Sequence, residues 1–304
     1  MNGVLSVLIP VVNWDLEALL SCLEAEIESR GLADQVEVII GDDGSESGYL
    51  EGNRRLAGER AWVEYHAGGK NIGRGPMRNL LASRAKGEYL LLLDADMLPD
   101  EEDFLSQYLE WIDASVQRPV CGGISYRQRC LHGRQYDFYT HKGVKTEALP
   151  AALRNRQPWR YFFTGNVMVK REIFTTQGID EQFQGYGYED VEWGIRLQQR
   201  YGIIHIDNTC SHLGLINRER AFLRMRASVD NFHLLQTLHP EYFQTARIGM
   251  VTGVLSVLPA PVLRLADRVL CALFRMNPGR SLSLLFFQLD KAVLLVLAAR
   301  KKQQ

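Results

Sequence analysis

Three short apolar runs in the first hundred residues each end at a polar turn, and segments with helical patterning lie between them. The runs cover residues 4–9, 36–40 and 89–93, and apolar residues recur at helical spacing over 15–30 and 76–86. We expect Pro10 to end the first strand. Alternating strands and helices predict an α/β fold built on a largely parallel sheet.

The polar turns after these strands carry amide and carboxylate side chains. Asn13 follows the first run, Asp42 and Asp43 end the second, and Asp94 and Asp96 follow the third. In open α/β sheets, ligands bind beyond the carboxyl ends of the strands. The sequence therefore predicts a binding crevice at that edge of the sheet.

The pattern is less regular beyond residue 119. Residues 124–127 and 161–163 are candidate strands, and residues 127–160 are basic, aromatic and typical of loops. A helix is predicted to start near Glu189 and a strand over 203–206.

Composition narrows the class of protein. The 304 residues are 46% hydrophobic and 23% charged, which excludes disordered and collagen-like chains. A net charge of -1 argues against a nucleic-acid partner. Five scattered cysteines favour a reducing compartment, and the first residues lack the basic segment of a cleaved signal peptide. We therefore expect a cytoplasmic location.

Asp94-Ala95-Asp96 is the first of four motifs that can carry chemistry. Two carboxylates at a strand end suit a hard divalent cation such as Mn²⁺ or Mg²⁺, which takes its other ligands from phosphates and water. The alternative is that the two aspartates only cap a turn before Pro99.

The other motifs are ambiguous when each is read alone. Residues 41–45 (Gly-Asp-Asp-Gly-Ser) suit ribose or base recognition but equally a plain Asp-Gly turn. Residues 69–75 are rich in glycine and cations, as phosphate sites are, yet match neither nucleotide-binding fingerprint. Residues 185–193 combine aromatic and acidic side chains, which suits a sugar site or simple N-capping of a helix.

Taken in order, these motifs resemble family-2 inverting glycosyltransferases of the GT-A fold across residues 4–215. The resemblance rests on Val-Leu-Ile-Pro-Val-Val-Asn, Gly-Asp-Asp-Gly-Ser, Asn-Ile-Gly-Arg-Gly-Pro-Met-Arg-Asn, Leu-Asp-Ala-Asp and Gly-Tyr-Glu-Asp. It implies a Rossmann-like, nucleotide-binding mixed sheet flanked by helices. The carboxyl half, with Gly-Tyr-Gly-Tyr-Glu-Asp-Val-Glu, resembles the galactosyltransferase-like part of chondroitin-polymerase-type enzymes.

The resemblance also implies a role for individual residues. Asp190 would be the catalytic base that deprotonates the acceptor hydroxyl, and Glu189 would orient the acceptor. Asp94 and Asp96 would bind ribose and the metal–diphosphate, and His212 would complete the metal site, although a lone histidine is often structural. Donor contacts are implied for Pro10, Asn13, Asp43, Asn71, Arg78, Asp94, Gly165 and Asn166, and Gly122-Gly123 resembles a further donor segment.

The implied function is metal-dependent, inverting transfer of a hexose or N-acetylhexosamine from a UDP-sugar to a saccharide or lipid-linked acceptor. The Gln-x-x-Arg-Trp motif of processive synthases is missing, since residues 198–201 read Gln-Gln-Arg-Tyr. This favours a single addition. Two alternatives remain: a non-catalytic nucleotide- or carbohydrate-binding module of the same fold, and a sugar nucleotidyltransferase.

The last 59 residues differ from the rest in charge. Residues 246–304 hold nine Lys/Arg and two Asp/Glu, a net charge of +7, which leaves -8 for residues 1–245. We expect a catalytic domain over 1–245 and a basic, apolar helical extension over 246–304.

No apolar run in the extension reaches the length of a membrane span, but a helix from residue 280 would have a polar face with Ser283 and Asp290 and an apolar one with Val293 and Val296. That pattern suits a helix lying on the cytoplasmic face of a membrane, whose anionic lipids attract Lys and Arg. The alternatives are packing on the catalytic domain and formation of a homodimer.

Overall fold

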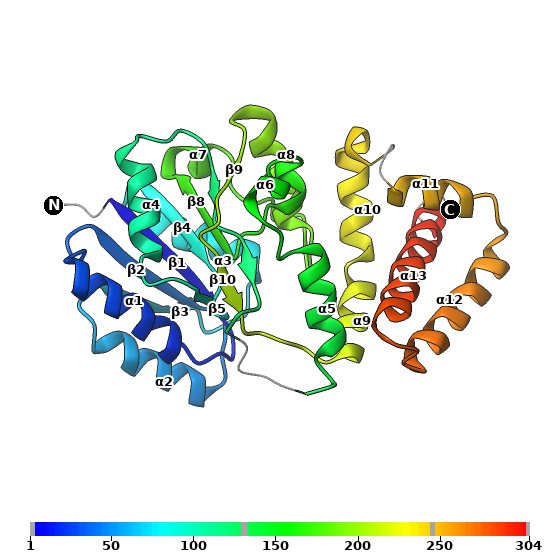
Figure 1. The fold of residues 1–304 in the computed structure, drawn as a ribbon, viewed down its shortest axis with the longest axis horizontal. Coiled ribbons are helices and arrows are strands. Elements are labelled where there is room, and N and C mark those ends of the chain that lie inside the picture. Colours follow the sequence, from blue (N-terminus) through cyan, green and yellow to red (C-terminus); the bar gives the residue numbers. More distant parts are fainter. Residues whose placement is uncertain (1–3, 129–132, 244–246, 302–304) are drawn as a thin grey trace. The chain divides into compact units, whose positions relative to one another are not determined.

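The computed structural model describes residues 4–128, 133–243 and 247–301. It contains a seven-stranded mixed sheet and a second sheet of three short strands (Figure 1). The order in the large sheet is β3 (Val63–Ala67), β2 (Val36–Asp42), β1 (Leu5–Val11), β4 (Tyr89–Leu93), β8 (Asn166–Lys170), β6 (Val120–Cys121) and β9 (Ile204–His205). The small sheet has the order β5 (Met97–Pro99), β10 (Cys210–His212) and β7 (Ile124–Ser125).

Strands β3, β2, β1 and β4 run parallel, so their carboxyl ends share one edge of the sheet. Strand β8 pairs antiparallel with β4, and this makes the sheet mixed. The expectation that Pro10 ends the first strand is wrong, because Pro10 pairs with Gly41 and β1 continues to Val11. Pairing of β1 with β4 stops at Leu8, so the proline, which has no N–H, lies beyond that ladder.

Helices cover both faces of the large sheet. A buried cluster joins β1, β2 and β4 to α3 (Arg74–Arg84), α7 (Arg171–Thr176) and α8 (Glu189–Arg200) through Leu8, Leu81, Phe174 and Trp193. In front of the sheet in Figure 1 lie α1 (Glu17–Arg30) and α4 (Phe104–Asp113). Helix α2 (Ser47–Gly58) connects β2 to β3. The predicted α/β fold is confirmed.

The segment from 127 to 163 is more helical than the sequence indicates. It contains α5 (Asp137–Thr146), α6 (Ala151–Arg154) and a 3₁₀ turn at Pro158–Tyr161. The expectation of a loop over 127–160 is therefore wrong for these parts, and residues 129–132 lie outside the described residues. The strand expected at 161–163 is also wrong, since the strand is β8 at Asn166–Lys170.

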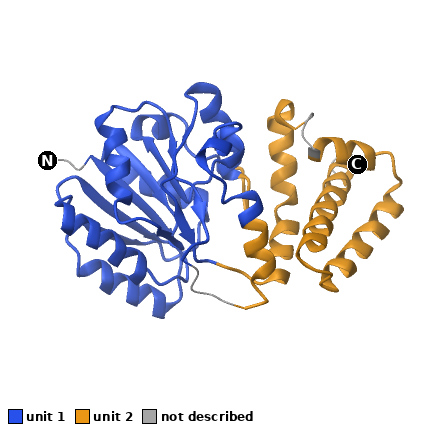
Figure 2. Cartoon of the chain, viewed as in Figure 1, with its two compact units in different colours: residues 1–130, 144–181, 189–214 blue, residues 131–143, 182–188, 215–304 orange. Residues whose placement is uncertain are grey.

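The chain divides into two compact units (Figure 2). The first comprises residues 1–130, 144–181 and 189–214, and the second comprises 131–143, 182–188 and 215–304. The second unit thus starts well before residue 246 and includes two short segments from earlier in the chain. The functional division into 1–245 and 246–304 stays a prediction.

The second unit is helical. Besides the start of α5 it holds α9 (Arg218–Ala227), α10 (Val229–Leu238), a 3₁₀ turn (Pro240–Tyr242), α11 (Arg247–Leu255), α12 (Ala260–Arg275) and α13 (Arg280–Lys301). Leu263 of α12 and Val293 and Val296 of α13 form one core cluster. The rings of Phe138, Phe222, Phe274 and Phe287 form a second contact group.

Helix α13 is continuous through Asp290 and Lys291. Among the described residues it is the one helix whose length and apolar composition would allow it to cross a membrane, and part of it is buried within the protein. The expected division of its faces is wrong. Ser283 and Asp290 are buried together with Val293 and Val296. The burial of Asp290 is possible because Arg226 of α9 forms ion pairs with both Asp290 and Asp267, each at 2.7 Å.

Four described cysteines, Cys22, Cys121, Cys210 and Cys271, are free thiols, and Cys130 lies outside the described residues.

Candidate active site

The polar turns after β1, β2 and β4 lie at the common edge of the sheet that the parallel pairing creates. Val11 pairs with Asp42, so Asn13 and Asp43 follow neighbouring strand ends. Asn13 has a φ of 49° and its Oδ1 accepts a 2.7 Å hydrogen bond from the Glu46 N–H. The predicted gathering of amide and carboxylate groups at this edge is confirmed for these turns.

Asp43 is 2% exposed and holds the loop that precedes α3. Its two carboxylate oxygens accept hydrogen bonds from the N–H groups of Ile72 (2.6 Å) and Gly73 (2.9 Å). The Asn71 side chain donates to the Asp43 carbonyl oxygen at 2.9 Å. The contacts of Asp43 and Asn71 with a donor stay predictions, but both residues shape the loop in which a donor would lie.

Arg78 and Asp94 join α3 to the end of β4. The Arg78 side chain is 1% exposed, and its Nη2 forms a hydrogen-bonded ion pair with Asp94 Oδ1. Its Nε and Nη1 are buried and have no partner among the described residues. Buried guanidinium N–H groups without acceptors are costly, so this arginine is suited to an anionic ligand such as a diphosphate.

Asp96, in the turn after β4, lies beside His212, the last residue of β10. His212 Nε2 lies 3.3 Å from Asp96 Oδ2. Burial opposes ionisation of Asp96, but the hydrogen bond and charge of His212, with Arg74 nearby, lower the pKa of its carboxyl below the ordinary value. Burial likewise opposes protonation of His212, and its hydrogen bond to Asp96 outweighs this and raises its pKa.

Two glycines keep space open around these carboxylates. A Cβ on Gly214 would lie 1.9 Å from Asp96 Oδ2, and one on Gly165 would lie 3.0 Å from Asp94 Oδ2. Carboxylate oxygen and imidazole nitrogen are suitable ligands for Mn²⁺. The residues therefore fit a divalent cation held by Asp96 and His212. Asp94, two residues before Asp96, forms its ion pair with Arg78.

Asp190 lies in the first turn of α8. Burial and the charge of Glu189 raise the pKa of the Asp190 carboxyl to about 7, against the lowering effect of Arg74 and Arg78. Glu189 is 7% exposed, and its Oε1 is 3.5 Å from Arg74 Nη2. Arg74 helps to lower the pKa of both Asp96 and Asp190, so both carboxyls lie within electrostatic range of its guanidinium.

The glycine-rich loop before α8 is held by contacts within the second unit. Asn231 of α10 donates to the carbonyl oxygens of Gln184 and Gly187, each at 2.9 Å. Tyr188 has a φ of 74°, and its hydroxyl forms a hydrogen bond with Lys291 of α13. Tyr188 is therefore tied to α13 within the second unit.

The side chains of some predicted site residues are buried and bonded within the protein. Asn166 is 1% exposed, accepts a hydrogen bond from Tyr108 and donates to the carbonyl oxygens of Gly123 and Asn208. Gly122 is packed in the same network, where a Cβ would lie 2.2 Å from the Asn208 oxygen. Trp193 is fully buried against Phe162 and Phe174, so this ring cannot stack on a sugar.

Sequence reasoning missed three contributors. Arg74 stands in a motif that was noted only for phosphate binding, and Gly214 follows the expected ligand His212 by two residues. Arg154 is fully buried, donating to the carbonyl oxygens of Gly122 (3.1 Å) and Ile206 (2.7 Å). No local pattern identifies a buried arginine whose acceptors lie so far away in the sequence.

Family models match most of the first unit. The model of glycosyl transferase family 2 matches residues 6–177, and a model described as the N-terminal domain of galactosyltransferase matches residues 148–212.

Curated relatives are distant and mostly longer. A chondroitin synthase of Escherichia coli is 28% identical in an alignment of 227 residues that covers 64% of this chain and 32% of that protein. An uncharacterized glycosyltransferase, YfnE of Bacillus subtilis (strain 168), is 26% identical in an alignment of 246 residues that covers 64% of this chain and 60% of that protein. The chain thus spans less than two thirds of either relative.

Solved structures share the fold. The mannosyltransferase PcManGT from Pyrobaculum calidifontis, in complex with GDP-Man and Mn²⁺, has a TM-score of 0.58 at 19% identity and covers 100% of this chain and 88% of its own. S. aureus TarS 1-349 in complex with UDP has a TM-score of 0.54 at 15% identity, covering 99% and 92%. The arrangement of strands and helices is therefore that of GT-A proteins.

Proposed function

Because the chain belongs to glycosyl transferase family 2, we propose that it moves a hexose or N-acetylhexosamine from a nucleoside-diphosphate sugar to an acceptor hydroxyl with inversion at the anomeric carbon. One observation carries the proposal: Arg74 and Arg78 link the carboxylates after β4 to a carboxyl at the start of α8 whose pKa is about 7.

The donor half of the site consists of Arg78, Asp94, Asp96 and His212. Arg78 has two buried nitrogens without a partner in the described part of the chain, and these suit a diphosphate oxygen. Asp96 and His212 would hold Mn²⁺ or Mg²⁺, which when bound neutralises negative charge on the departing diphosphate. Mn²⁺ accompanies the nucleotide sugar in the PcManGT complex, and this supports the same kind of donor here.

The acceptor half consists of Asp190, Glu189 and Arg74. In the proposed step the acceptor oxygen forms a bond to the anomeric carbon while the bond from that carbon to the diphosphate oxygen breaks. The hydroxyl proton passes to Asp190, whose pKa of about 7 allows it to be ionised at neutral pH and still basic enough to accept the proton. Glu189, held near Arg74 at 3.5 Å, would orient the acceptor.

We propose that the donor is a UDP-sugar, and UDP-galactose and UDP-GalNAc are the first candidates. The match of residues 148–212 to a galactosyltransferase domain supports the sugar, and the UDP complex of TarS supports the base. A single addition is proposed because the Gln-x-x-Arg-Trp motif is missing from this sequence.

The experiment is a release screen with UDP- and GDP-sugars, Mn²⁺ or Mg²⁺, and saccharide or lipid-linked acceptors. Release of nucleoside diphosphate together with a product one sugar longer, measured by mass spectrometry, supports the proposal. Release of pyrophosphate would indicate a nucleotidyltransferase. Tight binding of donor without release under any condition would favour a non-catalytic binding module.

The pH dependence of transfer should follow Asp190. Its raised pKa means that the carboxyl is protonated, and so inactive as a base, below about pH 7. We expect kcat/KM to fall about tenfold for each pH unit below that value and to level off above it. Initial rates in a constant-ionic-strength buffer series test this, and a profile that is flat across this range would exclude Asp190 as the base.

Membrane association is proposed for the second unit. Val254, Val257 and Leu265 are 72%, 81% and 61% exposed, and Val262 and Val269 on α12 are also exposed. Arg264 and Arg268 are exposed on the same helix. Apolar side chains beside arginines suit the headgroup region of an anionic leaflet. The proposed location is accordingly the cytoplasmic face of a membrane, where a lipid-linked acceptor would be found.

Vesicle flotation tests this with a double variant, Leu265→Glu with Val269→Glu. Recovery with vesicles rich in anionic lipid should fall at least about tenfold, since both exposed apolar contacts become charged repulsions. The matched control is Leu223→Glu with Leu238→Glu, which alters two exposed leucines of α9 and α10. Equal recovery for both doubles would contradict the proposal, and a dimer dissociated by the first double would favour a homodimer interface instead.

A further inference from the structure

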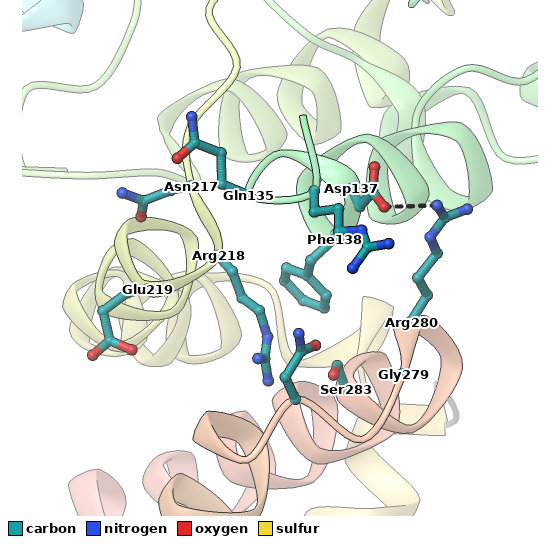
Figure 3. Close-up of a pocket in the computed structure, with 11 residues that line it drawn as sticks. Gln135, Asp137, Phe138, Asn217, Arg218, Glu219, Gly279, Arg280 and Ser283 are labelled. Atoms are coloured by element: carbon teal, nitrogen blue, oxygen red, sulfur yellow. Dashed lines mark hydrogen bonds and ion pairs between the residues drawn. The ribbon is translucent and has the colours of Figure 1, made fainter. Parts of the chain in front are cut away.

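The second unit contains a cavity of about 530 Å³ that belongs to no part of the candidate active site (Figure 3). Its walls come from the segments that open α5, α9 and α13, with Arg134, Phe138, Arg218, Arg280 and Ser283 among the lining residues. In Figure 3 the ring of Phe138 lies between the side chains of Arg218 and Arg280.

Three helices begin at this cavity. Helices α5, α9 and α13 start at Asp137, Arg218 and Arg280, and all three residues line it. The first N–H groups of a helix have no partner within the helix, and the helix dipole places partial positive charge there. Such ends favour anions, and here three of them meet, although at α9 the Asn217 side chain already accepts the Arg220 N–H at 2.8 Å.

Two buried polar groups at the same place lack partners among the described residues. Ser283 is 1% exposed, and no described residue forms a hydrogen bond with its hydroxyl. Arg218 has buried Nε and Nη2 atoms without acceptors among the described residues, and its guanidinium lies 4.1 Å from the centre of the Phe274 ring. Burial lowers the pKa of Arg218. An oxygen-rich ligand would satisfy both groups at once.

The carboxylates of the cavity wall are already paired with arginines. Asp137 forms a 2.7 Å ion pair with Arg280, and Glu219 forms one of 2.8 Å with Arg275. Figure 3 shows the Glu219 carboxylate directed away from Arg218. Within the described ranges no carboxylate pairs with Arg218, so its positive charge is available to a ligand.

We propose that this cavity binds a phosphate group carried by a larger molecule. A tetrahedral phosphate can accept hydrogen bonds from the guanidinium fork, the Ser283 hydroxyl and helix N–H groups together, which a flat carboxylate does less completely. The volume exceeds that of a bare phosphate and leaves room for an attached sugar or lipid headgroup. The site is independent of the proposed sugar transfer, because none of its residues is assigned to that reaction.

Calorimetric titration of the full chain in EDTA, with glucose 1-phosphate and inorganic phosphate as probes, tests the proposal without metal–diphosphate binding. We expect binding that Arg218→Gln weakens at least about tenfold and Ser283→Ala weakens measurably. The matched control is Arg220→Gln, an exposed arginine two residues later on the same helix, which should bind within about twofold of the wild type. Circular dichroism confirms folding, and Ser283→Ala keeps the test valid if Arg218→Gln does not fold.

A flotation arm distinguishes the sources of the phosphate. Binding of the soluble probes that depends on Arg218 supports a sugar phosphate. A lipid headgroup is supported if the chain is retained on phosphatidic acid vesicles but not on phosphatidylcholine vesicles, and if this retention is lost in Arg218→Gln and kept in Arg220→Gln. No binding in either arm, or equal weakening by the two arginine substitutions, would overturn the proposal.

Discussion

Asp190→Asn is expected to lower kcat for sugar transfer by about 10²–10⁴-fold, the usual contribution of a general base, while donor binding stays nearly intact. Asparagine keeps the size and polarity of the side chain but cannot accept the acceptor proton. The residue lies at the start of α8 and is not one of the groups that would hold the diphosphate. The kcat from initial rates and the Kd of UDP from calorimetry, both with Mn²⁺, provide the comparison.

The control for this substitution is Asp34→Asn, which removes an exposed carboxylate outside the site. It should leave both kcat and the Kd of UDP unchanged. If Asp190→Asn turns over at the wild-type rate, Asp190 is not the base. If instead it loses UDP binding along with activity, the residue acts through the donor site.

Gly214→Ala is expected to weaken Mn²⁺ binding and reduce transfer by about 10–100-fold, the range found when groups that orient metal ligands are altered. The added Cβ would lie 1.9 Å from Asp96 Oδ2, so the carboxylate must move away from its place beside His212. The φ of Gly214 is not in the left-handed region, and alanine therefore brings no backbone strain of its own. Activity measured against Mn²⁺ concentration gives the shift.

Gly52→Ala provides the matched control. Gly52 lies within α2, and a Cβ there meets no atom within 4 Å. Alanine in a helix is favoured over glycine by about 0.5–1 kcal/mol, so this variant should be at least as stable as the wild type and equally active. An unchanged Mn²⁺ requirement in Gly214→Ala, with the thermal midpoint preserved, would show that Asp96 does not hold the cation.

The first half of the site could be predicted because local sequence determines it. The short apolar run at 89–93 is typical of a buried strand in an α/β chain, and the strand is Tyr89–Leu93 as expected. The parallel pairing of β1 with β2 and β4 then brings the following polar turns to one edge.

The hydrogen bonds that these polar side chains form within the protein could not be predicted. In the sequence Asp43 looks like a free carboxylate, but it accepts hydrogen bonds from the N–H groups of Ile72 and Gly73, which lie 29 and 30 positions later in the chain. Asn166 is similarly used by Tyr108, 58 positions away. Hydrogen bonds between residues so far apart in the chain depend on the tertiary structure, and local sequence patterns do not reveal them.

The second unit shows the same limit for helix faces. The helical period of residues 280–301 was predicted, yet which face is buried depends on partners. Asp290 is fully buried because Arg226, from a helix more than sixty residues earlier, forms an ion pair with it. An unpaired buried carboxylate would be strongly disfavoured, so without knowledge of that arginine the sequence predicts exposure.

The proposed transfer is a single displacement in which Asp190 activates the acceptor hydroxyl. The anomeric configuration of the product, read from its ¹H NMR spectrum with an α-linked UDP-sugar as donor, is the decisive measurement. One in-line attack inverts the anomeric carbon, so we expect a β-linked product. An α-linked product formed by the wild-type chain would contradict it.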